Sequence, residues 1–324
     1  MTNPMVQDRL EFARRQLAAN QAVGEAVRRY LFDRPRQINL IDVGQSRATD
    51  KPKLVIRAHV EKLIERSELE SIGRRSVTDE RIQGYEVEVV EGAYRPQRWG
   101  GWGGWGGFYR RSDPLVGGVS VGAEYFPAGT LGGIVRDRAT QRLMLLSNWH
   151  VLVVQWGLRR GQRIYQPARY DGGTDADEIG TLDRDAMNSS LDAAVALFNE
   201  RRQVSARQSS GRLVTGSGRP AIGMLVEKSG RTTGTTYGRI TGMFGVQRLR
   251  YGWIERVIRD VVTIEPRNGS IVSSGGDSGS WWIDSDTGAA VGLHFAGSDY
   301  PERALALDME EVLTALKVDI PALL

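Results

Sequence analysis

The chain has 324 residues, of which 40% are hydrophobic and 25% are charged, and this ordinary globular composition excludes a largely disordered protein. No stretch approaches the roughly 18 consecutive apolar residues of a membrane span, and the net charge of +4 comes from interspersed charges, so neither membrane insertion nor nucleic-acid binding is expected. The lack of cysteine excludes disulfides and thiol catalysis, and because the N-terminus has no apolar signal-peptide core we expect a cytoplasmic protein.

The N-terminal part predicts one helix followed by a small α+β domain. Apolar residues recur at helical spacing from residue 5 to about residue 31, so we expect residues 1–34 to form an amphipathic helix. Strands are then expected at residues 38–44, 54–60 and 85–90, with a helix over 61–70. These elements place a small α+β domain at residues 35–96.

A short repeat of Trp with paired Gly occupies residues 97–112. Glycine at this density costs too much backbone entropy for a helix or strand, so we expect a mobile linker. A second interpretation stays open, because the three tryptophans could dock on the following domain as a regulatory flap or anchor a partner protein.

From residue 113 to residue 324 the pattern becomes β-rich. Short apolar runs separated by Gly, Asp and Asn predict many short strands, at residues 132–135, 143–147, 193–198, 237–240 and 257–264. This pattern favours barrels or sandwiches over a helix-alternating sheet. A late helix is expected over residues 308–316, with Asp308 as its N-cap.

Three residues supply the groups needed to activate a serine nucleophile. A hydroxyl becomes a good nucleophile when an imidazole takes its proton, and a carboxylate orients that imidazole. We expect His150 to end a strand and Asp192 to open another, and Ser278 lies in a Gly-Asp-Ser-Gly sequence. The flanking glycines allow a tight turn, so we expect the backbone N–H groups of Gly276 and Ser278 to form an oxyanion hole.

These segments resemble those of trypsin-like serine proteases. Ser-Asn-Trp-His-Val-Leu, Asp-Ala-Ala-Val-Ala and Gly-Asp-Ser-Gly-Ser match the family's histidine, aspartate and serine segments in that order, and the nearest likeness is to prokaryotic members with an N-terminal α+β domain. The resemblance implies a mostly β, chymotrypsin-like double β-barrel of two six-stranded barrels, with the site between them. It also implies a serine endopeptidase that acts on protein or peptide substrates through an acyl-enzyme and needs no cofactor or metal.

The strand after the serine suggests a substrate preference. Val272 stands where trypsin itself has an acidic pocket residue, which disfavours cleavage after Lys or Arg. His294 lies in Gly-Leu-His-Phe, which resembles the pocket strand of glutamyl endopeptidases and predicts a preference for Glu or Asp. The alternative is that His294 is a buried core histidine. The predicted substrate pocket comprises Val272, Ser273, Ser274, His294, Phe295 and Gly297.

Asp277 raises a question about activation. In zymogen-type trypsins the matching aspartate pairs with a newly freed N-terminus, but here a long segment precedes the protease domain. We expect Arg231 or a neighbouring backbone group to pair with Asp277. Processing near Arg110 and Arg111 is an alternative, as is activation by a protein partner.

Other functions have weaker support. The sequence Gly-Val-Ser-Val-Gly around Ser120 fits the hydrolase pattern G-x-S-x-G, and residues 216–221 fit a dinucleotide pattern, but no helix is expected after either. The acidic run 171–178 is expected to be a solvated loop rather than a calcium site. A different class remains open: a latent or non-catalytic scaffold with the protease fold, acting through its N-terminal domain and the Trp-Gly linker.

Overall fold

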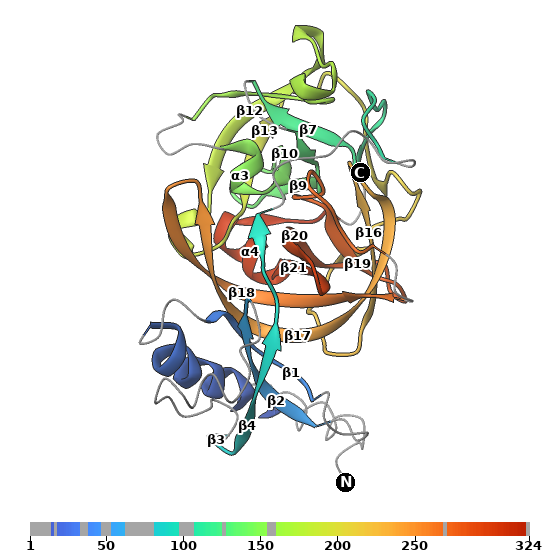
Figure 1. Cartoon of the computed structure of the whole chain (residues 1–324). Coiled ribbons are helices and arrows are strands. Elements are labelled where there is room, and N and C mark those ends of the chain that lie inside the picture. Colours follow the sequence, from blue (N-terminus) through green and yellow to red (C-terminus); the bar gives the residue numbers. More distant parts are fainter. Residues whose placement is uncertain are drawn as a thin grey trace.

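The computed structural model describes residues 14–15, 18–32, 38–46, 53–61, 81–96, 107–124, 128–153, 160–267 and 271–321. Most of the described elements are strands, and they form two large sheets stacked one above the other in Figure 1. None of the described helices is long and apolar enough to cross a membrane.

The first sheet carries the histidine and aspartate segments. Its eight strands run in the order β22-β9-β10-β13-β12-β11-β7-β8. Their bounds are β7 Ser120–Ala123, β8 Gly129–Thr130, β9 Gly133–Asp137, β10 Leu143–Ser147, β11 Arg163–Tyr165, β12 Glu178–Asp185, β13 Ala194–Phe198 and β22 Val318–Asp319. The six strands expected for the first barrel are thus joined by two further strands of two residues each, β8 and β22, at the ends of the sheet. A separate parallel pair joins β6 (Leu115–Gly117) to β14 (Val204–Gln208).

The second sheet contains a closed six-stranded barrel. Its strands are β16 Leu225–Gly230, β17 Gly234–Tyr251, β18 Ile254–Pro266, β19 Trp281–Asp284, β20 Ala289–Asp299 and β21 Glu302–Asp308. They run in the order β16-β19-β20-β21-β18-β17, and pairing of β16 with β17 closes the ring. The short β15 (Gly216–Ser217) and β5 (Arg95–Pro96) add to β20. The predicted six-stranded second barrel is confirmed.

One apolar core joins the two sheets. It includes Leu145 and Val195 from the first sheet together with Trp281 and Leu293 from the second, all at most 1% exposed. The indole of Trp281 packs directly against Gly132. A Cβ added at Gly132 would lie 2.1 Å from the indole Nε1, so no larger residue fits there. The two sheets are therefore held at a fixed separation.

Short helices follow or connect the strands. These are α3 Trp149–Leu152, η3 Arg169–Asp171, η4 Asp175–Asp177, η5 Met187–Ser189 and α4 Met309–Leu316. The late helix is confirmed as α4, and the side chain of Asp308 accepts a hydrogen bond from the backbone N–H of Glu310, as expected for an N-cap.

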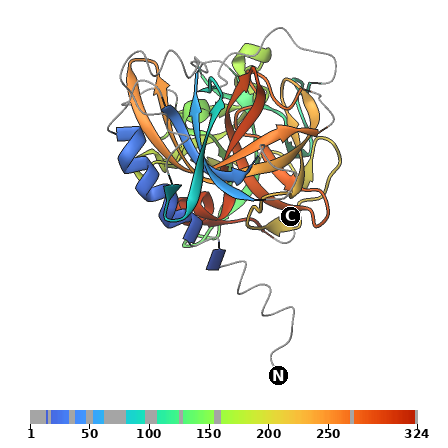
Figure 2. The same cartoon turned by 60° about the horizontal axis from the view of Figure 1, so that its bottom comes forward.

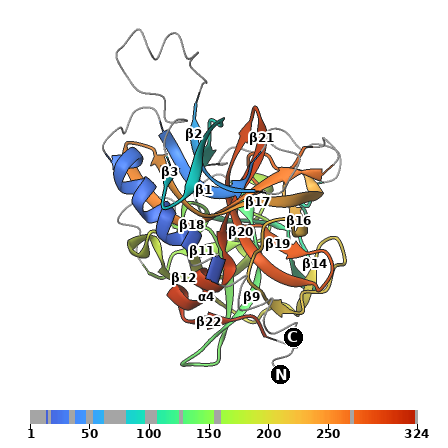
Figure 3. The same cartoon turned by 90° about the horizontal axis from the view of Figure 1, so that it is seen from below.

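The N-terminal strands extend the second sheet. They are β1 Ile38–Gln45, β2 Leu54–Val60, β3 Arg81–Ile82 and β4 Tyr85–Glu91, and β1 pairs antiparallel with β17. A helix over residues 18–26 continues as the π-helix η1 (Val27–Phe32) and packs its apolar side on these strands, as Figures 2 and 3 show. Three predicted strands and part of the predicted helix are thus confirmed.

Strands on either side of the expected boundary near residue 96 belong to one hydrogen-bonded sheet, so the division into domains stays a prediction. The helix expected over 61–70 and most of the Trp-Gly linker lie outside the described residues.

Candidate active site

His150 and Asp192 form a buried pair beside the paired ends of β10 and β13, in the middle of the first sheet. The sequence placed His150 at the end of a strand, but β10 ends at Ser147 and His150 lies in the single-turn helix α3. This turn brings its Nδ1 to 2.5 Å from Asp192 Oδ2, while the backbone N–H of His150 donates to Oδ1 at 3.0 Å. The carboxylate therefore holds both the ring and the backbone of the histidine.

Two further groups fix Asp192. The Tyr251 hydroxyl, at the end of β17, donates to Asp192 Oδ2 at 2.7 Å, and the Asn148 amide donates to the backbone carbonyl of Asp192 at 2.6 Å. Burial alone would raise the pKa of Asp192, but the charge of His150 and the hydrogen bonds from His150 and Tyr251 outweigh burial and lower that pKa. The carboxylate therefore stays charged and can stabilise a protonated imidazole. Sequence reasoning missed Tyr251, which lies 59 residues from its partner.

Ser278 lies in a tight turn just before β19. Asp277 N–H donates to the Ser274 carbonyl at 3.1 Å, and the Ser280 N–H donates to the Asp277 carbonyl at 3.0 Å. Gly279 has φ +99°, and a Cβ there would lie 2.0 Å from the Thr130 carbonyl, so only glycine fits. The local sequence thus folds into a tight turn that carries Ser278, which is 1% exposed.

The serine turn and the histidine helix meet at Gly129. A Cβ added at Gly129 would lie 2.5 Å from a Val151 methyl group and 3.0 Å from the Ser278 carbonyl oxygen. The Ser278 hydroxyl donates to the Phe295 carbonyl at 3.4 Å, and within the described part of the chain His150 Nε2 makes no hydrogen bond. The structure therefore brings the three predicted residues to one place but joins only His150 and Asp192 directly. Catalytic hydrogen bonds are often long in unbound enzymes and tighten with substrate.

The predicted oxyanion hole depends on the peptide groups before Ser278. Gly276 has φ +98°, and its carbonyl accepts a hydrogen bond of 2.9 Å from the Thr130 hydroxyl. The role of the Gly276 and Ser278 N–H groups as oxyanion donors stays a prediction.

Asp277 pairs with Lys228, not with Arg231. Lys228 Nζ lies 2.9 Å from Asp277 Oδ2, and both side chains are fully buried. Thr232 N–H and Thr233 N–H donate to Oδ1, at 2.9 and 3.1 Å, so the expected backbone contribution is present. Arg231 instead forms an ion pair with Asp171. The prediction that Arg231 pairs with Asp277 was therefore wrong.

An internal ammonium therefore neutralises Asp277. Burial would raise the pKa of Asp277, but Lys228 and the hydrogen bonds outweigh it and lower that pKa.

The predicted pocket residues lie on two segments next to Ser278. Val272 and Ser273 precede the serine turn and are 0% and 3% exposed, while His294, Phe295 and Gly297 belong to β20. The backbone N–H of Ser274 donates to Asp277 Oδ2 at 3.0 Å.

His294 is completely buried. Its ring meets Trp282 edge-on at a centroid distance of 6.1 Å, and burial, with a smaller contribution from Lys228, lowers its pKa to about 3. An imidazole in this environment is neutral at physiological pH.

Glu302 is a charged neighbour of the pocket that sequence reasoning missed. Its Oε1 accepts hydrogen bonds from Val272 N–H at 2.7 Å and Ser273 N–H at 3.3 Å. It stands opposite Asp299 in the hairpin that joins β20 to β21. The carboxylate is half-buried, and burial raises its pKa. Glu302 is the first residue of β21, and nothing in its sequence context pointed to the pocket.

No group of three or more His, Cys, Asp or Glu side chains within the described ranges is placed to hold a metal ion. The acidic run 171–178 is largely engaged by arginines, because Asp171 pairs with Arg231 and Asp177 with Arg111 and Arg202.

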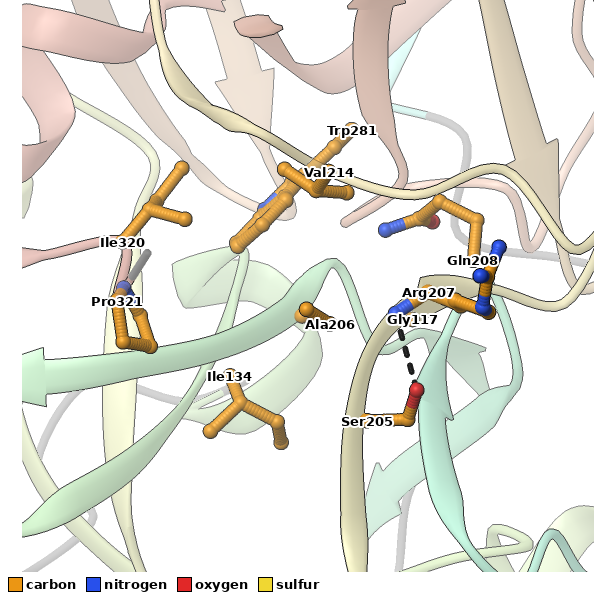
Figure 4. Close-up of a pocket in the computed structure, with 11 residues that line it drawn as sticks. Gly117, Ile134, Ser205, Ala206, Arg207, Gln208, Val214, Trp281, Ile320 and Pro321 are labelled. Carbon is orange, nitrogen blue, oxygen red and sulfur yellow. Dashed lines mark hydrogen bonds between the residues drawn. The ribbon is translucent and has the colours of Figure 1, made fainter. Parts of the chain in front are cut away.

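A small pocket lies elsewhere, where β9 and β14 meet Trp281 and the C-terminal residues Ile320 and Pro321 (Figure 4). It is lined by neither His150, Asp192 nor Ser278, so it is separate from the candidate site.

No protein-family model matches the chain, and no curated protein matches it in sequence. Among solved structures, Thermobifida fusca protease A is 18% identical with a TM-score of 0.46, covering 63% of this chain and 96% of its own. Cellulomonas bogoriensis chymotrypsin is 18% identical with a TM-score of 0.49, covering 64% and 98%. A glutamic acid-specific serine protease, described as using a histidine triad in substrate binding, is 16% identical with a TM-score of 0.48, covering 64% and 100%.

The predicted mostly β, chymotrypsin-like fold is confirmed by the two large sheets of this chain, the second of which contains a closed six-stranded barrel. At identities below 20% the solved structures carry no residue roles over to this chain, so every role proposed below rests on the chain's own geometry.

Proposed function

We propose that this chain is a serine endopeptidase with Ser278 as nucleophile, His150 as general base and Asp192 as the orienting carboxylate. The observation that carries the proposal is the buried His150–Asp192 pair, with its 2.5 Å contact, beside a glycine-bounded turn that presents Ser278. The Tyr251 hydroxyl, which donates to Asp192 Oδ2 at 2.7 Å, holds the carboxylate in place beside the imidazole.

The proposed reaction follows from these positions. The Ser278 hydroxyl turns from the Phe295 carbonyl toward His150 Nε2 and attacks the substrate carbonyl carbon, while the imidazole takes its proton. The N–H groups of Gly276 and Ser278 stabilise the resulting oxyanion. The imidazolium then protonates the leaving amine, which leaves an ester on Ser278. Water, deprotonated by the same imidazole, hydrolyses that ester and restores the serine.

The ion pair of Lys228 with Asp277 supports activity in the uncut chain. The buried aspartate has a positive partner within the same domain, so the proposal requires no free N-terminus and no processing near Arg110 and Arg111. Activation by a protein partner remains a separate hypothesis, which a comparison of the purified chain with a cell extract would test.

The acidic preference predicted from His294 is a further hypothesis about substrate. The neutral, buried imidazole and the neighbouring carboxylate of Glu302 both weigh against it, because a carboxylate repels an acidic substrate side chain. Cleavage sites mapped on a proteome-derived peptide library decide the question. Enrichment of Glu or Asp before the cut, lost in His294→Ala, would support the sequence prediction, whereas enrichment of Lys or Arg would assign the preference to Glu302.

Labelling with a fluorophosphonate tests the catalytic proposal directly. The wild-type chain is expected to take up one equivalent of label, Ser278→Ala none, and the exposed control Ser210→Ala the same amount as wild type. His150→Ala and Asp192→Asn are expected to slow labelling by about 10³-fold or more. A folded wild-type protein that neither labels nor cleaves unfolded substrates would favour the latent scaffold instead.

A further inference from the structure

The edge of β20 beside the nucleophile is the starting point. Gly279 N–H donates to the His294 carbonyl at 2.9 Å, and the Ser278 hydroxyl donates to the next carbonyl, that of Phe295. The strand β20 therefore runs along the serine turn as far as Phe295 and then continues past it as Ala296 and Gly297. Whatever pairs with β20 at Ala296 and Gly297 lies immediately next to the site.

Both edges of β20 are occupied at this point. On one side β21 pairs with it, with Ala296 opposite Leu305. On the other side the two-residue strand β5 pairs antiparallel, with Pro96 opposite Ala296 and Arg95 opposite Gly297. This second edge of β20 is shared by three segments. β19 pairs with it up to Leu293, the serine turn contacts it at His294 and Phe295, and β5 follows.

The direction of β5 is that of a bound peptide. A peptide that adds to a sheet edge gains its affinity from main-chain hydrogen bonds, and a substrate on this edge must bring its next residue to Phe295 and Ser278. The chain from Arg95 to Pro96 runs from Gly297 toward Ala296, which is toward Ser278. We propose that Arg95 and Pro96 occupy the substrate strand and block extended peptides from the site. This inference rests on the proposed function.

The residues before β5 are anchored firmly. The Tyr94 side chain is 7% exposed, and its hydroxyl lies 2.7 Å from His59 Nδ1. Arg303, on β21, donates to the Glu91 carbonyl and, at 3.4 Å, to the Tyr94 hydroxyl. His59 Nε2 in turn lies 3.2 Å from Asp42. The segment is thus attached to both the N-terminal strands and the second barrel.

The anchors make a short strand effective. Tethering raises the local concentration of β5 to the order of mM, so even two residues of weak pairing compete with a peptide present at micromolar concentration. Because Pro96 has no N–H, the pairing is short and can be displaced by a substrate that forms a longer ladder. The expected enzyme therefore has a raised KM for peptides and a normal kcat once saturated.

Replacing Arg95 with proline tests the inference, because it removes the only backbone N–H in β5. In the full-length chain, Arg95→Pro is expected to lower KM for a fluorogenic peptide about tenfold with kcat within twofold. Arg95→Ala keeps the N–H and is expected to lower KM by less. Tyr94→Phe removes the anchoring hydroxyl but keeps the ring, and it is expected to lower KM two- to threefold.

A trans experiment separates this inference from the proposed function. A fluorescent peptide of residues 91–96, Glu-Gly-Ala-Tyr-Arg-Pro, is expected to bind Arg95→Pro at least fivefold more tightly than wild type, whether or not either protein is an active protease. Fluorophosphonate labelling in the same samples reports the nucleophile alone. If Arg95→Pro and Tyr94→Phe both melt as wild type does and leave KM and peptide binding unchanged, β5 does not block the site and the inference is overturned. If labelling is absent but the peptide binds as expected, the proposed function fails and the occupancy of β20 stands.

Discussion

Replacing Lys228 with methionine removes the buried ammonium and keeps most of the side-chain volume. The Asp277 carboxylate is then left charged and fully buried, with hydrogen bonds from Thr232, Thr233 and Ser274 but no cation. Breaking a buried ion pair by removing one partner costs about 3–5 kcal/mol. At roughly 2–4 °C per kcal/mol for a domain of this size, the midpoint of thermal unfolding is expected to fall by roughly 6–20 °C.

The same variant should react more slowly with a fluorophosphonate at a temperature where it is folded, because Asp277 holds Ser274 and the turn that carries Ser278. The matched control is Arg160→Met, which removes an ion pair with Asp183 from a side chain that is 78% exposed. Exposed pairs contribute about 0–1 kcal/mol, so this control should melt within a few degrees of wild type. A Lys228→Met protein with the melting temperature and labelling rate of wild type would refute the assignment of Lys228 as the partner that replaces a free N-terminus.

Three other changes have defined outcomes. Tyr251→Phe removes a hydrogen bond to the buried, charged Asp192, so labelling of the nucleophile is expected to slow by roughly tenfold and the melting temperature to fall by roughly 3–12 °C; an unchanged labelling rate would show that Tyr251 does not position the carboxylate. Glu302→Gln is expected to reduce kcat/KM for substrates with Lys before the cut by tenfold or more relative to substrates with Leu, as measured on paired fluorogenic peptides. Burial raises the pKa of Asp308 to about 6, so its protonated form is favoured by folding and the stability it contributes is present below about pH 4 and lost as the pH rises through 6. Asp308→Asn keeps an N-cap side chain and should therefore melt higher than wild type at pH 8 and equally at pH 4; a gain of the same size at both pH values would contradict this.

The local parts of the site were predictable from the sequence. Asp192 and Ser278 each lie in a short segment whose neighbours, an apolar run or a pair of glycines, determine the local backbone. That information is contained within about six residues. The strand positions were predictable for the same reason, because the apolar pattern that indicates a strand is read from adjacent residues. His150 follows an apolar run as well, but it lies in the helix α3 and not at the end of the strand.

Partners that are distant in the sequence were not predictable. Lys228 is 49 residues from Asp277, and Tyr251 is 59 residues from Asp192. Arg231 was as good a candidate as Lys228 for the partner of Asp277. The sequence alone does not reveal which side chains of β16 and of the turn after it face the serine turn. For His294 the sequence left a pocket residue and a buried core residue both open, because a strand that lines a pocket and a strand covered on both faces have the same apolar sequence.

The pairing of β1 with β17 has a consequence for any attempt to isolate the protease part. β17 is 18 residues long, and β16 covers its edge only from Gly234 to Arg239, whereas β1 covers it from Gly242 to Gln247. A fragment that begins at residue 113 would leave the second of these stretches as an open strand edge, beside apolar side chains such as Val246 that now pack under the N-terminal helix. Open edges of this kind join other chains. Such a fragment is therefore expected to self-associate. In the full chain β1 protects this edge of the barrel from pairing with other molecules.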